Sequence, residues 1–134
     1  MRQIKVQTKK LREVLNITPQ IEKMLTAHPA KDGMIHLYLM HTTAALTTAY
    51  IEDQVDLGMM GAFEVMVPSV TKEHTHHLGH LPAHVVASML GPHLAIPIKN
   101  NKLLLGTFQS IVLVELNGPQ KREIIIDYKE QSKY

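Results

Sequence analysis

The segment from Met34 to His41 constrains the fold most tightly, because it is almost entirely apolar. Successive side chains of a strand point to opposite faces, so Ile35, Leu37, Leu39 and His41 would share one face. A nearly continuous apolar run is typical of a strand in the middle of a sheet. We therefore expect a domain built around this strand, with His41 at the point where the strand passes into a loop.

Helical and strand patterns surround the central strand. Thr18 and Pro19 are typical of a helix start, with Thr capping the free amides, and an apolar stripe follows to residue 27. Residues 51–66 and 82–90 also show helical spacing, and Gly91 suits the left-handed residue that ends a helix. Strand patterns cover residues 3–8, 94–98, 102–107, 110–116 and 123–128. This order predicts an α+β fold, with mixed or antiparallel sheets packed with about three helices, in a single domain over residues 1–134.

The composition narrows the class of protein. The sequence contains no cysteine, which excludes a disulfide framework, a thiolate zinc site and a cysteine nucleophile. The formal charge is +2 and the aromatic content is 4%, so a stacking platform for nucleic acid is not expected. The sequence has no signal-like start, and no apolar run approaches the roughly 20 residues of a membrane span. These features indicate a cytoplasmic protein with neither nucleic acid nor membrane as a partner.

The nine histidines are the unusual part of the composition. Four of them lie within one short segment: His74, His76, His77 and His80. Neutral imidazoles bind divalent transition metals, and a catalytic zinc site often has three protein ligands and a water molecule. Three of the group His41, His76, His80 and His84 could converge on one zinc ion. The alternative is an exposed polar loop whose histidines have no role. A two-metal H-x-H-x-D-H motif is not matched, because Leu78 stands at the aspartate position.

Further candidates lie in the second half of the chain. Gln109 and Glu115 would share one face of a strand with two aliphatic residues, and buried polar groups are costly without partners. The alternative for Glu115 is a solvated position at the strand edge. Ser88 shares a helix face with His84 and would orient its ring, contact a ligand, or only provide a small side chain for packing. Arg122 would hold a phosphate with two hydrogen bonds or be an ordinary surface cation.

Four motifs along the chain resemble those of a known family. Residues 41–47 (HTTAALT) are similar to H-T-[ST]-A-x-L-T, and residues 83–91 (AHVVASMLG) to A-H-x-x-A-S-x-L-G. Residues 106–109 (GTFQ) are similar to G-T-W-Q, and residues 115–122 (ELNGPQKR) to E-x-[DN]-G-P-R-x-R. In this order and spacing they resemble the YjbQ family, whose members are usually described as secondary thiamine-phosphate synthases. The resemblance spans residues 34–126.

The resemblance implies an α+β protein that forms a homotrimer, with a site near the subunit boundaries. It implies a catalytic set made of His41, Asp53, His76, His84, Gln109 and Glu115. The accompanying ligand-binding residues would be Thr42, Thr43, Ser88 and Arg122. The sequence departs from the family pattern at Ala49, Tyr50, Ile51, Leu78 and His80. The site is therefore a variant in which Asp53 keeps its register and Glu52 is a candidate to replace a lost carboxylate.

Three functions follow as hypotheses. The first is a thiamine-phosphate synthase that joins a pyrimidine methyl diphosphate to a thiazole phosphate, with magnesium and basic side chains neutralising the departing diphosphate. The second is a zinc-dependent hydrolase or lyase in which His41, His76 and His84 hold the metal and Asp53 or Glu115 acts as general base. The third is a non-enzymatic module that binds phosphate or another small anion. The first and third share a small phosphorylated molecule as the ligand.

Overall fold

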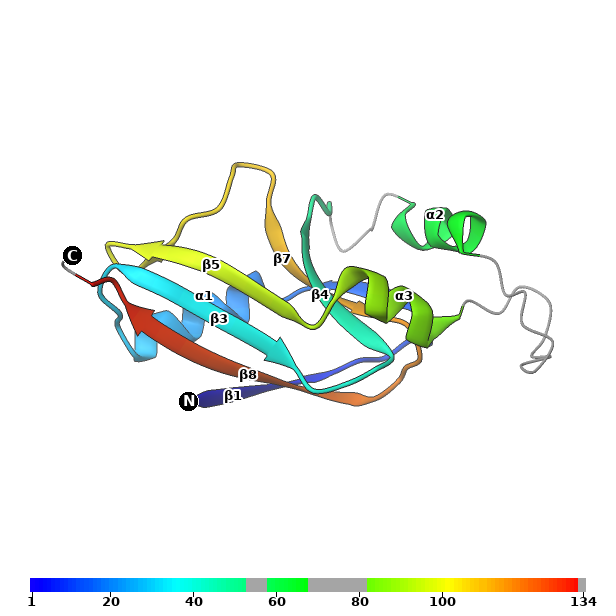
Figure 1. Cartoon of the computed structure of the whole chain (residues 1–134), viewed down its shortest axis with the longest axis horizontal. Helices are drawn as coiled ribbons and strands as arrows, with labels where there is room; N and C mark the ends of the chain where they lie inside the picture. The colour runs from blue at the N-terminus through cyan, green and yellow to red at the C-terminus, as the bar shows by residue number, and fades with distance from the viewer. Residues whose placement is uncertain (53–57, 68–81, 133–134) are drawn as a thin grey trace.

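Eight strands and three helices make up residues 1–52, 58–67 and 82–132, the part of the chain that the computed structural model describes (Figure 1). The strands are β1 (Arg2–Gln7), β2 (Glu13–Asn16), β3 (Gly33–Leu39), β4 (Ala44–Ala49), β5 (His93–Lys99), β6 (Lys102–Leu103), β7 (Ser110–Glu115) and β8 (Lys121–Glu130). The helices are α1 (Thr18–Ala27), α2 (Met59–Met66) and α3 (Ala83–Leu90). All strand pairs are antiparallel, and they form a five-stranded sheet in the order β1-β8-β3-β5-β6 and a three-stranded sheet in the order β2-β7-β4.

The five-stranded sheet is centred on β3, as the apolar run predicts. Ile35, Leu37 and Leu39 are buried on one face of β3, together with Ile21 and Leu25 of α1. The strand ends at Leu39, so His41 lies in the loop beyond it. The burial of one face leaves the other face of this sheet turned outward, which matters for a pair of histidines described below.

The three-stranded sheet lies between two hydrophobic clusters. On its central strand β7, Ile111 and Leu113 belong to the cluster of the five-stranded sheet and α1. Val112 and Val114 point to the opposite face and pack in a second cluster with Val86 of α3. Because both faces of β7 are covered, residues 111–116 are all buried, which explains the uninterrupted apolar run in this strand.

Several predicted elements differ from the structure. The strands β2 and β4 were not expected from the sequence, the strand predicted at 102–107 is regular only over Lys102–Leu103, and the helix predicted at 51–66 begins only at Met59. Thr18 does not cap α1, because it is the first residue of the helix and Ile17 lies at the cap position. The Thr18 hydroxyl instead accepts a hydrogen bond from the amide of Ile111 at 2.8 Å. The predicted helix of residues 82–90 and the turn at Asn100 and Asn101, both with positive φ, are confirmed.

Two of the predicted segments cannot be compared with the structure. The histidine-rich segment at 71–80 and residues 53–57 lie outside the described residues. Among the helices of the described part of the chain, none has the length and apolar character needed to cross a bilayer.

Candidate functional site

The centre of the site is a buried ion pair between Glu115, at the end of β7, and Arg122, near the start of β8. The exposed fraction of the side chain is 0% for Glu115 and 1% for Arg122. Arg122 Nε donates to Glu115 Oε1 at 2.9 Å, and Arg122 Nη2 donates to Glu115 Oε2. This two-pronged geometry is the strong form of the arginine–carboxylate interaction. The alternative in which Glu115 is solvated at the strand edge is therefore wrong.

Other donors complete the coordination of the Glu115 carboxylate. Thr8 Oγ1, just beyond β1, donates to Oε1 at 2.6 Å, and the amides of Leu116 and Asn117 donate to Oε2 at 3.0 and 3.2 Å. Burial alone would raise the pKa of Glu115, but the hydrogen bonds from Arg122 and Thr8 outweigh it and lower the pKa below its usual value. Glu115 is thus ionised at neutral pH and its oxygens are occupied by donors, so of the two general bases in the zinc hypothesis, Asp53 and Glu115, the second is not available.

Arg122 extends the network to the loop between β3 and β4. Its Nη2 donates to the carbonyl oxygen of Thr43 at 3.1 Å and to Thr43 Oγ1 at 2.9 Å. The same carbonyl accepts a hydrogen bond from the amide of Leu116 at 3.1 Å. The motif at 41–47 and the motif at 115–122 are therefore joined in the interior. Because Arg122 is buried and its Nε and Nη2 groups are used in these contacts, they are not free to hold a phosphate with two hydrogen bonds. Thr43 likewise faces inward, whereas Thr42 is exposed.

His41 is held by the residue that follows the arginine. The amide of Glu123 donates to His41 Nε2 at 3.0 Å. A neutral imidazole has one donor and one acceptor nitrogen, so an acceptor at Nε2 places the proton on Nδ1. Burial, followed by the charge of Arg122, lowers the pKa of His41, while Glu123 and Glu115 oppose this more weakly. The ring is therefore neutral at pH 7, and its Nδ1–H group can donate a hydrogen bond to a ligand.

Helix α3 supplies the second family histidine that the structure describes. His84 and Ser88 are both exposed on α3, which packs against β4, the strand that carries the rest of the first motif. Ser88 Oγ donates to the carbonyl oxygen of His84 at 2.9 Å, within the helix. The hydroxyl therefore does not orient the His84 ring, which excludes one of the three roles considered for Ser88.

Gln109 lies at the opposite end of β7 from Glu115. Its Oε1 accepts a hydrogen bond from the amide of Gly106 at 2.8 Å, and its Nε2 donates to Thr48 Oγ1 at 3.4 Å. Next to it, the exposed ring of Phe108 meets Tyr50 edge to face, with ring centroids 5.4 Å apart. The length of β7, roughly 3.3 Å per residue, separates this end of the strand from the ion pair. Within one chain, the structure does not bring Gln109 to Glu115.

The metal hypothesis depends partly on residues that the structure does not describe. Asp53 and His76 lie outside the described ranges, as do His74, His77 and His80. Over residues 1–52, 58–67 and 82–132, no three histidine, aspartate or glutamate side chains converge as metal ligands would. The lone pair of His41 at Nε2 is already used by the Glu123 amide, and Nδ1 has a proton. As His41 stands, its donor atoms do not fit a zinc ion.

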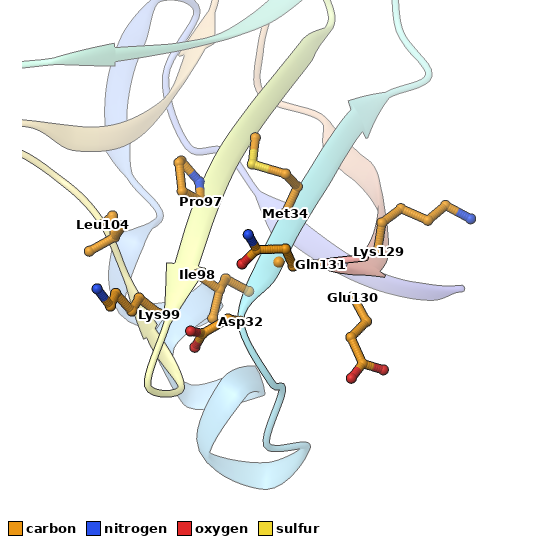
Figure 2. A pocket seen from close by; sticks show the side chains of 10 residues that line it. Asp32, Met34, Pro97, Ile98, Lys99, Leu104, Lys129, Glu130 and Gln131 are labelled. Atoms are coloured by element: carbon orange, nitrogen blue, oxygen red, sulfur yellow. The ribbon is translucent and has the colours of Figure 1, made fainter. Parts of the chain in front are cut away.

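One cavity among the described residues lies away from the motifs. It has a volume of about 490 Å³ and opens beside the start of β3 and the end of β8 (Figure 2). Met34, Pro97 and Leu104 line it on one side, and Lys99, Lys129 and Glu130 are polar residues around it. The loop with His41 follows the other end of β3, so this cavity is not part of the site built on the ion pair.

The family of the chain is decided by its motifs together with comparisons over its whole length. A family model described as UPF0047 protein YjbQ-like matches residues 2–131. The chain belongs to the YjbQ family. A UPF0047 protein of Methanocaldococcus jannaschii is 34% identical over 122 residues, which cover 90% of this chain and 88% of that protein. The YjbQ protein of Salmonella typhimurium is 35% identical over 112 residues, which cover 78% of this chain and 81% of that protein.

Solved structures of YjbQ-like proteins confirm the predicted α+β fold. A crystal structure from Sulfolobus solfataricus P2, described as a YbjQ-like protein of unknown function, superposes with a TM-score of 0.84 at 27% identity and covers 97% of this chain and 96% of that one. A hypothetical protein from Aeropyrum pernix K1 gives a TM-score of 0.85 at 25% identity and covers 97% of this chain and 98% of that one. Antiparallel sheets packed with three helices in the described residues are thus the architecture of the YjbQ family.

Sequence reasoning missed two members of the site. Thr8 lies outside the four motifs, in a segment with no distinctive residue types, and only the tertiary fold places it against Glu115. Glu123 contributes through its backbone amide, which no sequence pattern reports. The sequence did contain a signal for the turn between β7 and β8, because a glycine followed by proline, here Gly118 and Pro119, is typical of turns. In the structure Gly118 is tightly packed: a Cβ atom there would lie 2.9 Å from Glu115 Cγ.

Proposed function

We propose that this YjbQ-family protein is a small cytoplasmic enzyme acting on phosphorylated molecules, with thiamine-phosphate synthesis as its reaction. The observation that carries the proposal is the hydrogen bond from the Glu123 amide to His41 Nε2. It fixes a neutral imidazole with Nδ1–H as its free donor, on a loop anchored by the Arg122–Thr43 contacts. A rigid donor of this kind suits a phosphate oxygen on which negative charge increases during the reaction.

The proposed reaction has a simple balance. The ring nitrogen of the thiazole phosphate forms a bond to the methylene carbon of the pyrimidine methyl diphosphate, the bond from that carbon to the diphosphate oxygen breaks, and diphosphate leaves with the electron pair. His41 would donate to the diphosphate from Nδ1, and the exposed His84 of α3 would be a second contact. Glu115 and Arg122 would act as positioning residues, since both are buried and paired with each other.

Magnesium fits this proposal better than zinc. Magnesium is usually bound by one or two carboxylates together with the phosphates of the substrate, so it would need little from the protein. Asp53, which the family resemblance places in the catalytic set, would supply such a carboxylate. Zinc, in contrast, needs the lone pair that His41 uses for the Glu123 amide. Zinc chemistry at this site would be supported only by a zinc ion that purified wild-type protein binds and a His41 variant loses.

Binding of an inorganic phosphate or a related anion without catalysis is the alternative that the same geometry favours. It would use the same Nδ1–H donor of His41 and would need no leaving group. The two functions differ in whether a product forms, and a single set of variants therefore separates them.

We also propose that the protein forms a homotrimer. Two apolar helices support this: no residue of α2 is buried within one chain, and Val65 and Met66 are exposed by 83% and 68%. On α3, Met89 is exposed by 63%. Exposed apolar side chains gathered on the surface of a helix are typical of protein interfaces. Sedimentation or light scattering would measure the mass directly, and a monomer at micromolar concentration would contradict the proposal.

The test of function compares two variants of His41. The purified full chain is incubated with the pyrimidine methyl diphosphate, the thiazole phosphate and magnesium, and thiamine phosphate is measured by chromatography. His41→Gln keeps an acceptor for the Glu123 amide but removes the Nδ1–H donor, so we expect a rate loss of about 100-fold. His41→Asn places an amide donor close to the former Nδ1 and should retain more activity. His28→Gln, at an exposed site after α1, is the control.

Each result has a distinct meaning. Product formation that is lost in His41→Gln and kept in His28→Gln supports the synthase. Absence of product in the wild-type chain, with phosphate binding that disappears in His41→Gln, replaces the synthase with the anion-binding function. Equal behaviour of wild type and His41→Gln in both assays would contradict both.

A further inference from the structure

Two histidines meet on the outer face of the five-stranded sheet, outside all four motifs. His36 lies on β3 and is paired in register with Ala95 of β5, so His93, two residues earlier on β5, is its diagonal neighbour on the same face. The side chains that alternate with them, including Ile35 and Leu37, are buried on the other face. The two rings are therefore presented away from the hydrophobic core.

The rings are arranged edge to edge. His36 Nδ1 and His93 Nε2 are 3.1 Å apart, whereas the ring centroids are 5.3 Å apart and the ring planes differ by 12°. Since the two nitrogens are much closer than the centroids, each lies on the side of its ring that faces the other. In the neutral pair, one nitrogen donates and the other accepts. A lone pair is thus already directed into the space between the rings.

We propose that His36 and His93 form a binding site for a divalent transition-metal ion of the zinc class. Neutral imidazole is a preferred ligand for such ions. Two metal–nitrogen bonds of about 2.0–2.1 Å, meeting at a tetrahedral angle, place the ligand nitrogens roughly 3.3 Å apart. The observed 3.1 Å is close to this separation, but the nitrogens now face each other directly. Each ring would therefore turn by roughly 35° to aim its lone pair at a tetrahedral ion, a movement open to side chains that solvent reaches.

The proton balance of the site is simple. When the ion binds, the ring that donates in the His36–His93 hydrogen bond moves its proton to its other nitrogen, through water. Both rings stay neutral, and both lone pairs then face the ion. No proton is released overall and no oxidant or reductant takes part. Protonation of either ring would compete with the ion, as for any imidazole ligand.

Among the described residues, a third ligand side chain does not converge with the two rings, but the neighbouring strand carries a carboxylate that a change of rotamer would bring to them. Asp127 of β8 is directly opposite His36 in the register of the sheet and therefore projects from the same face. Its Oδ2 lies 3.2 Å from Lys129 Nζ; the Lys129 side chain is largely exposed and that of Asp127 is half-buried. A change of rotamer would release the carboxylate toward the ion. Water molecules would complete a tetrahedral site, the arrangement typical of zinc sites that are open to solvent.

This site is separate from the one proposed for the enzymatic function. His36 and His93 are on the outer face of the sheet, whereas His41 lies beyond the end of β3 and is bonded to the backbone of β8. Failure of either proposal leaves the other standing. Because other histidines of the chain also bind metal ions in principle, the experiment has to count ions and assign them to residues.

The experiment is equilibrium dialysis of the full chain against zinc, followed by elemental analysis. We expect His36→Gln and His93→Gln each to bind one zinc ion per chain fewer than wild type, and the double variant to lose no more than either single variant. His28→Gln, a change at another exposed histidine, should bind as many ions as wild type. Nitrogen-15 NMR of the wild-type rings should show zinc-dependent shifts at His36 Nδ1 and His93 Nε2.

The opposite results are equally clear. Equal zinc content in wild type and both single variants would overturn the site, and so would an equal loss in His28→Gln. For the third ligand, Asp127→Asn should weaken zinc binding severalfold without changing the number of ions. An unchanged affinity would remove Asp127 from the proposal.

Discussion

Arg122 donates to both carboxylate oxygens of Glu115 in the interior of the protein, where at most 1% of either side chain is exposed. The two residues are seven positions apart, on either side of the turn between β7 and β8. Through Thr8 and Thr43 the pair also connects the end of β1 with the loop that follows β3. This pair is the structural centre on which the position of His41 depends.

Removal of one partner of this pair should destabilise the protein strongly. Arg122→Met leaves the Glu115 carboxylate buried without its cation, and we expect the free energy of unfolding to fall by about 3–5 kcal/mol. The double variant Glu115→Gln, Arg122→Met has no buried charge and keeps an acceptor for the amides of Leu116 and Asn117, so it should recover a large part of this loss. Urea unfolding would measure the free energy of unfolding of the single and the double variant.

The control for this prediction is an ion pair on the surface. Lys31 and Glu130 are 3.7 Å apart, with exposed fractions of 83% and 57%. Lys31→Met should change the free energy of unfolding by no more than about 0.5 kcal/mol. A fall in the free energy of unfolding for Arg122→Met as small as that for Lys31→Met would show that the buried pair does not stabilise the fold in the way argued.

The stability of the fold should decline in acid because of Glu115. Its pKa is lower in the folded protein than the ordinary value of 4.5, so the unfolded chain takes up a proton first as the pH falls. The contribution of Glu115 is complete above pH 4.5 and is lost as the pH decreases below that value. In Thr8→Val, which lacks the 2.6 Å hydrogen bond to Glu115, the dependence on pH should be weaker. Urea unfolding between pH 7 and pH 3 measures the free energy of unfolding of both proteins. The same dependence of this free energy on pH in wild type and Thr8→Val would contradict this explanation.

His41 should remain neutral to a lower pH than the same residue in the unfolded chain. Its pKa lies below the ordinary value of 6.5, first because of burial and then because of the charge of Arg122. The unfolded chain therefore binds the proton first, and His41 contributes less to stability as the pH falls below 6.5. Nitrogen-15 NMR at neutral pH should show a protonated Nδ1 and an unprotonated Nε2. The reverse tautomer would remove the basis of the proposed donor.

Gly118 should not tolerate a larger residue. A Cβ atom at this position would lie 2.2 Å from the carbonyl oxygen of Lys10 and 2.9 Å from Thr8 Oγ1. Gly118→Ala should therefore lower the free energy of unfolding by about 1–3 kcal/mol, as overpacking of a tight site does. Gly61→Ala is the matched change, since a Cβ atom there meets nothing within 4 Å and alanine favours the helix α2. Urea unfolding should find the second variant at least as stable as wild type.

The fold could be predicted from local patterns to a greater degree than the site. The strand predicted at 34–41 and the helices predicted at 18–27 and 82–90 are found as Gly33–Leu39, Thr18–Ala27 and Ala83–Leu90. Their apolar periodicity depends only on neighbouring residues, so it could be recognised in the sequence. The strands β2 and β4 were missed, because four residues with one charge and a threonine-rich segment have no period that distinguishes them. Their strand conformation comes from pairing with the buried strand β7.

The sequence by itself determined the family, the central strand and the identity of His41, Glu115 and Arg122 as residues of interest. Only the tertiary structure decided their roles. It changed Arg122 from a candidate phosphate ligand into the partner of Glu115, and it fixed the tautomer of His41. The physical reason is distance along the chain: Thr8 and Glu115 are 107 residues apart, and His41 and Glu123 are 82 apart. Local patterns identify residue types, but charges and hydrogen bonds take their values from partners that only folding brings together.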